Sequence, residues 1–134
     1  MSEIKIKLAA GTDVGLVRKN NEDNFVVNRD LSQSEWIIPQ SSETIPLGKY
    51  GTLLVVADGM GGTNAGEVAS AIAIETVQNA FTPEKLENIV TLEDEMVTEE
   101  AIEEFLTKTV KAADLNIVNA SKEDSSTQGM GTTI

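Results

Sequence analysis

An apolar run that stops at a cluster of glycines occupies the middle of this chain. Residues 52–57 read TLLVVA and residues 58–62 read DGMGG. Because the run shows no alternation of polar and apolar residues, it predicts a strand buried on both faces that ends directly before Asp58. The carboxylate of Asp58 is then held by a rigid element where the backbone leaves the sheet. This placement makes it a candidate for binding chemistry.

The other hydrophobic patterns predict strands in the first part of the chain and helices in the second. Residues 4–8 and 24–28 have the composition of strands. Asn64 can cap a helix that continues to Phe81, and Thr82 with Pro83 is a start signal for a short helix that ends near Val90. Thr98 starts a third helix, whose predicted buried face consists of Ile102, Phe105, Leu106, Val110, Ala113 and Ile117. We therefore predict an α+β fold.

The length of 134 residues fits one globular unit, residues 1–134. Residues 31–49 are rich in Ser, Gln and Thr and contain two prolines, which predicts an insertion or an edge hairpin. Residues 129–134 look like the opening of a strand that stops unfinished, and such a strand leaves backbone donors and acceptors unpaired. We therefore expect this chain to be a piece of a longer domain.

Composition excludes several classes of function. The chain has no cysteine and no histidine, so thiol chemistry, a Ser-His-Asp triad and imidazole ligation are ruled out, and a metal must be a hard cation held by oxygen. The net charge of -12 argues against nucleic-acid binding. No apolar stretch approaches the roughly 18 residues of a membrane span, and the first residues alternate instead of forming a signal peptide. We expect a cytoplasmic protein without a membrane partner.

Asp58 and Gly59 form the first candidate site. An aspartate can bridge two hard cations, and the neighbouring glycine lets its carbonyl oxygen approach a metal without a side chain in the way. The alternative is an ordinary turn, for which Asp-Gly is a common signal. The glycines at 59, 61 and 62 before a helix favour a loop whose amides face an anion or a hydrated ion.

Arg18, Glu22 and Asp23 form the second candidate site. The planar guanidinium of Arg18 suits a phosphoryl group, although a surface ion pair is the alternative. Glu22 and Asp23 point to opposite sides of an extended chain, so we expect only one to face a shared cavity and hold metal-bound water. Glu67, at the start of the first helix, is interpreted as stabilising the helix dipole.

Seven acidic residues near the start of the third helix are interpreted as a solvated surface, with a docking surface as the alternative. They are Glu93, Asp94, Glu95, Glu99, Glu100, Glu103 and Glu104.

Together these segments resemble the protein phosphatase 2C (PPM) family, especially its bacterial members. The segments that carry the resemblance are TDVGLVR at 12–18 with NED at 21–23, VVADGMGG at 55–62 with GEVAS at 66–70, and GMGTT at 129–133. They occur in the order of the family. The resemblance implies that this is the N-terminal part of a PPM-type α/β/β/α sandwich, in which helices flank two antiparallel sheets.

The resemblance also implies roles for individual residues. Asp58 and Gly59 would hold a site of two Mn²⁺ or Mg²⁺ ions, Asp23 and Glu22 would hold metal-bound waters, and Arg18 would bind the phosphate of a phosphorylated protein substrate. The implied reaction is hydrolysis of phosphoserine or phosphothreonine by a water activated between the metals. The remaining metal ligands of the family lie beyond Ile134, so the chain is expected to bind metal weakly and to be inactive alone. The alternative is a regulatory module that binds phosphoproteins without turnover.

Overall fold

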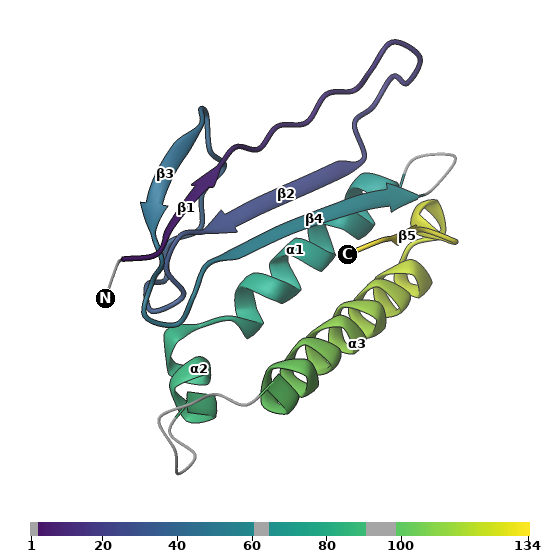
Figure 1. Cartoon of the computed structure of the whole chain (residues 1–134). Coiled ribbons are helices and arrows are strands. Elements are labelled where there is room, and N and C mark those ends of the chain that lie inside the picture. Colours follow the sequence, from purple (N-terminus) through teal and green to yellow (C-terminus); the bar gives the residue numbers. More distant parts are fainter. Residues whose placement is uncertain (1–2, 61–64, 91–98) are drawn as a thin grey trace.

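The computed structural model describes residues 3–60, 65–90 and 99–134 (Figure 1). In chain order, these residues form β1 (Lys5–Leu8), β2 (Asp23–Asn28), β3 (Glu43–Pro46), β4 (Leu53–Met60), α1 (Gly66–Ala80), α2 (Pro83–Val90), α3 (Glu99–Glu123), the 3-10 helix η1 (Ser125–Thr127) and β5 (Gly131–Thr132). No helix in these ranges is both long and apolar enough to span a bilayer.

The strands of the described residues form two antiparallel sheets. One has the order β2-β4-β5 and the other pairs β1 with β3. The register of β2 with β4 places Asp23 opposite Asp58 and Phe25 opposite Val56. The α+β class and the antiparallel sheets are thus confirmed, whereas the four-layer sandwich stays a prediction.

Strand β4 is covered on one face only, so the prediction of a strand buried on both faces is wrong. Val55 and Ala57 are buried beside helix α1, whereas Leu54 and Val56 on the other face are 55% and 65% exposed. Helices α1 and α3 lie on the same side of the β2–β4 pair (Figure 1). The uninterrupted apolar pattern therefore does not mean that both faces are covered within the described residues.

Strand β4 is also longer than expected. It continues through Asp58 to Met60, because Gly59 and Met60 pair with β5. Asp58 consequently lies inside a strand. The prediction from the sequence, that the strand ends directly before Asp58, is wrong. The backbone of Asp58 is fixed by β5 and by the residue that follows β5: the carbonyl oxygen of Asp58 accepts hydrogen bonds from Thr133 N (2.9 Å) and Thr132 Oγ1 (2.9 Å).

The two sheets meet at Val27, which is 2% exposed and packs with Leu8 of β1 and Ile45 of β3. Val27 also forms an isolated bridge with Ile37, held by backbone hydrogen bonds of 2.9 and 2.8 Å. Residues 31–49 therefore supply both the edge strand β3, which pairs with β1, and a contact with β2. They are built into the sheets through these contacts.

Helix α1 packs on β4 through small residues. Ala69 and Ala73 are fully buried against Ala57, which lets the helix approach the strand closely. Asn64, the predicted cap, lies outside the described residues, and Ala65 at the N-cap position makes no side-chain cap hydrogen bond. Fully buried small residues make this contact sensitive to any added atom.

The predicted start of helix α2 is confirmed. The backbone N–H of Lys85 donates to Thr82 Oγ1 at 3.4 Å, and Pro83 occupies the first helical position. A threonine hydroxyl at this place satisfies one of the amides that the first turn leaves without a partner.

Fewer side chains of helix α3 are buried than its sequence predicts, and they form a narrow stripe along one face of the helix. Thr109, Ala113 and Ile117 are buried, and Phe105 is half-buried edge-on against Phe81, with ring centroids 4.9 Å apart. The other predicted core positions, which are Ile102, Leu106 and Val110, are 42–48% exposed. The reason is geometric, because α3 packs mainly against the single helix α1, which covers a narrow stripe.

The acidic start of α3 agrees with the predicted solvated surface where the structure describes it. Glu99, Glu100, Glu103 and Glu104 are exposed, and Glu104 forms an i,i+4 ion pair with Lys108. Thr98, Glu93, Asp94 and Glu95 lie outside the described residues.

Candidate functional site

A polar cavity of about 190 Å³ lies where the 10–22 loop meets strands β2 and β4. It brings together every residue of the two candidate sites, although they lie up to about forty positions apart in the sequence. The lining residues are Asp13, Val14, Arg18, Asn20, Asn21, Glu22, Asp23, Asp58 and Gly59.

The register of strands β2 and β4 places the two aspartates of the cavity next to each other. Asp23 and Asp58 are direct partners across the antiparallel β2–β4 pair, so their side chains lie on the same face of the sheet. Both residues are exposed, and within the described parts of the chain neither carboxylate takes part in a hydrogen bond or an ion pair. Two adjacent carboxylates without internal partners are suited to bind a cation.

Arg18 lines the same cavity from the loop between β1 and β2. It is exposed and forms no ion pair with any described residue, so the structure does not support the surface ion pair that its sequence position allowed. Its guanidinium N–H groups remain available to a phosphoryl group.

Turn hydrogen bonds hold the loop around the cavity. Asp13 Oδ1 accepts from the N–H of Gly15 at 2.7 Å, and Asn21 Oδ1 accepts from the N–H of Asp23 at 3.1 Å. Asn21 also donates to Thr12 Oγ1 at 2.8 Å, which ties the two ends of the loop together. Asp13, Asn20 and Asn21 were not predicted as site residues. The available signal was that aspartate and asparagine commonly form turns of the kind that Asp13 and Asn21 make here.

Glu22 and Asp23 both line the cavity, whereas the sequence predicted that only one would. Alternation applies within a strand, but β2 begins at Asp23, so Glu22 precedes the extended segment. The carboxylate of Glu22 lies against Gly66 at the start of α1: a Cβ added there would be 2.7 Å from Glu22 Oε2.

The structure explains the glycine at position 59 by close backbone contacts, and not by the approach of a metal to its carbonyl oxygen, as the sequence had predicted. A Cβ at position 59 would collide with the carbonyl oxygen of Gly66 and would lie 2.6 Å from that of Glu22. The close approach of α1, β2 and β4 therefore requires glycine here, whatever binds in the cavity. Gly61 and Gly62 lie outside the described residues.

Glu67 does not line the cavity. It lies in the first turn of α1, which agrees with the interpretation that it stabilises the helix dipole. Its Oε2 is buried and has no hydrogen-bond partner among the described residues.

The donors at the cavity fit part of the coordination shell of a hard cation. The lining residues Asp23, Asp58 and Glu22 carry carboxylate oxygens and Gly59 carries a backbone carbonyl oxygen, and all are of the type that Mg²⁺ and Mn²⁺ prefer. Within residues 3–60, 65–90 and 99–134, however, no three acidic side chains are grouped so that they could hold a metal on their own. Further ligands are needed to complete such a site.

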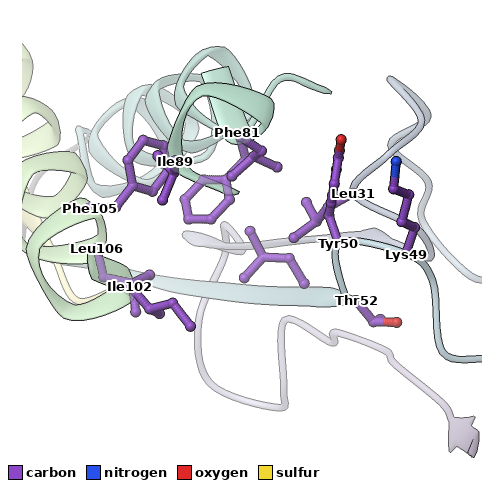
Figure 2. A pocket seen from close by; sticks show the side chains of 11 residues that line it. Leu31, Lys49, Tyr50, Thr52, Phe81, Ile89, Ile102, Phe105 and Leu106 are labelled. Atoms are coloured by element: carbon purple, nitrogen blue, oxygen red, sulfur yellow. The ribbon is translucent and has the colours of Figure 1, made fainter. Parts of the chain in front are cut away.

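A larger cavity of about 600 Å³ has a different character. Figure 2 shows Phe81, Ile89 and Phe105 on one side of it and Tyr50 and Lys49 on the other. Among the residues that the structure describes, its lining is largely apolar and contains no carboxylate. The described residues therefore offer no carboxylate oxygen to a metal ion at this cavity.

Comparison with known proteins finds bacterial relatives. The chain is 32% identical over 123 residues to the serine/threonine phosphatase stp of Listeria monocytogenes serotype 4b, and 30% identical over 123 residues to that of Listeria innocua. Each match covers 92% of this chain but only 38% of the relative, so the chain spans well under half the length of these curated relatives.

No family model matches the chain, and no solved structure matches it significantly. The relatives are named serine/threonine phosphatases, which is the class of protein that the motifs at 12–23, 55–62, 66–70 and 129–133 resemble. The resemblance to bacterial PPM-type serine/threonine phosphatases is therefore confirmed, as a match of nearly the whole chain to part of such a protein.

Proposed function

We propose that this chain is part of a metal-dependent protein phosphatase that hydrolyses phosphoserine and phosphothreonine. The observation that carries the proposal is the shared cavity: Arg18 from a loop, Asp23 from β2 and Asp58 from β4 all line it. One positive group suited to phosphate thus lies with carboxylates suited to divalent cations.

Asp58 and the carbonyl of Gly59 would hold the ions, with Asp23 and Glu22 binding them through water. Bound Mn²⁺ or Mg²⁺ would supply positive charge and a water molecule acidic enough to act as nucleophile near neutral pH. Because the chain covers 38% of its relatives and groups no three acidic side chains among its described residues, we expect it to bind metal weakly and to be nearly inactive alone.

Arg18 would orient the phosphate of the protein substrate. Its two outer N–H groups can each donate to one phosphate oxygen, which fixes both the position and the rotation of the group. The local charge matters because the chain carries a net charge of -12, a background that repels an anionic substrate. A lysine at this position keeps the charge but cannot form the bidentate contact.

The test is hydrolysis of a phosphothreonine peptide with Mn²⁺ by the full-length gene product. Asp58→Asn should lower kcat/KM at least about 100-fold, the loss typical when a group that stabilises transition-state charge is removed. Asp114→Asn on the exposed surface of α3 is the matched control and should keep full activity. Unchanged activity in Asp58→Asn would refute the proposal.

A second candidate is a module that binds phosphoproteins without turnover. It is favoured by the absence of a three-carboxylate group among the described residues, while Arg18 remains available. The two functions differ in metal dependence and product. A module of this kind would bind a phosphothreonine peptide equally well with and without EDTA and release no phosphate, whereas the phosphatase would release phosphate only with metal.

A further inference from the structure

The buried hydroxyl of Ser70 connects helix α1 with the start of β2. Ser70 is 0% exposed, and its Oγ donates to the carbonyl oxygen of Glu22 at 2.7 Å. The side-chain amide of Asn24 donates to the same Oγ at 3.0 Å. A serine hydroxyl has one proton, and the carbonyl oxygen of Glu67 lies farther away at 3.2 Å, so the bond to Glu22 takes precedence.

The carbonyl oxygen of Glu22 also binds the third element of the cavity wall. It accepts a hydrogen bond from the backbone N–H of Gly59 at 3.3 Å. One backbone oxygen therefore joins α1, through Ser70, to β4, through Gly59. Glu22 and Gly59 both line the polar cavity, and their neighbours Asp23 and Asp58 do as well.

We propose that Ser70 is a positioning residue for this cavity. Through the carbonyl of Glu22 it fixes the segment Glu22–Asp23 relative to Gly59, and so sets the spacing of the oxygen donors without touching a ligand. The effect on metal affinity rests on the proposed function, but the effect on the backbone does not. Groups that orient metal ligands from outside the coordination shell typically change metal affinity 10–100-fold when they are removed.

Helix α1 also contains a matched control, Thr76. Its hydroxyl donates to the carbonyl oxygen of Ile72 at 2.8 Å and accepts from the side-chain amide of Asn116 at 3.0 Å. Like Ser70, it is buried and linked to a carbonyl and an asparagine amide, but it joins α1 to α3 and does not line the cavity. Ser70→Ala and Thr76→Val each remove one buried hydroxyl and leave the amide of one asparagine without that partner.

The experiment compares the two variants in the 134-residue chain by two measurements. Amide hydrogen exchange of Gly59 is measured by NMR and corrected for any change in global stability, and Mn²⁺ affinity is measured by water proton relaxation. We expect Ser70→Ala to speed exchange at Gly59 at least about 10-fold and to weaken Mn²⁺ binding about 10–100-fold. Thr76→Val should change neither value.

The outcomes separate this inference from the proposed function. Unchanged exchange at Gly59 in Ser70→Ala, or an equal change in Thr76→Val, would overturn the positioning role. Detectable Mn²⁺ binding with the same affinity in Ser70→Ala and in the wild type would overturn it as well. If the wild-type chain and the full-length protein both fail to bind Mn²⁺, the metal-dependent function is wrong. In that case, faster Gly59 exchange in Ser70→Ala but not in Thr76→Val still supports the role of Ser70 in positioning the cavity wall.

Discussion

The close approach of helix α1 to strands β2 and β4 makes Gly59→Ala an informative substitution. A Cβ at this position would lie 2.6 Å from the carbonyl oxygen of Glu22 and closer still to that of Gly66, whereas Cβ contacts in proteins stay above 3.0 Å. Relief of the Glu22 contact alone requires a shift of 3.0 − 2.6 = 0.4 Å. Both obstructing atoms belong to the backbone, so no side-chain rotation can relieve the clash.

The expected loss of stability follows from three contributions. Overpacking of this kind costs about 1–3 kcal/mol. Movement of Gly59 away from Glu22 also weakens the hydrogen bond between them, worth roughly 0.5–1.5 kcal/mol. Alanine restricts the unfolded chain more than glycine does, which returns about 0.4–1 kcal/mol. We therefore expect Gly59→Ala to lower the free energy of unfolding by about 2 kcal/mol, a substantial share of the roughly 5–15 kcal/mol typical of a domain.

Urea denaturation followed by far-UV circular dichroism measures this loss directly. Gly131→Ala is the control in the same sheet, because a Cβ there meets only Met60 Cε at 3.8 Å, an ordinary contact. Its free energy of unfolding should stay within about 0.5 kcal/mol of the wild-type value. If both variants unfold at the same urea concentration as the wild type, the argument that backbone approach requires a glycine at position 59 is refuted.

Two further predictions concern the sheet contact and a surface carboxylate. Val27→Ala should lower the free energy of unfolding by about 2 kcal/mol, since two methyl groups leave the contact with Leu8 and Ile45. Val56→Ala, at a 65% exposed position on the neighbouring strand, should cost less than about 0.5 kcal/mol, and equal losses in urea denaturation would contradict the assigned contact. Hydrogen bonds from the backbone N–H and the side chain of Ser126 lower the pKa of Asp124, so its stabilising contribution should be present at neutral pH and disappear as the pH falls through this lowered value. An NMR titration should place its midpoint below that of an aspartate in an unstructured peptide, and a midpoint at or above the peptide value would exclude this effect.

The sequence was sufficient for features that depend on neighbouring residues. Thr82 and Pro83 marked the start of α2, because the capping hydroxyl and its amide partner lie within one turn. The kind of metal donor was also evident, since the side chains of a chain without cysteine or histidine can offer a metal only oxygen, whereas metal binding itself stays a prediction. The ordered motifs identified the family resemblance without knowledge of the fold.

The predictions that failed depended on neighbours distant in sequence. The apolar residues of β4 do not reveal that helices cover one face while Val56 stays exposed on the other. In α3, the apolar pattern included Leu106 and Val110, yet the single neighbouring helix covers a stripe centred on Thr109 and Ala113.

The sequence by itself determined which groups are present: an arginine, several carboxylates and a glycine after an aspartate. Only the tertiary structure decided that Arg18 and Asp58 share a cavity, that Asp23 lies opposite Asp58, and that Gly59 leaves room for the carbonyl oxygens of its neighbours. The physical reason is that residue chemistry and short-range spacing are carried by the local chain, whereas strand register, burial and close backbone contacts arise from packing between segments far apart in it.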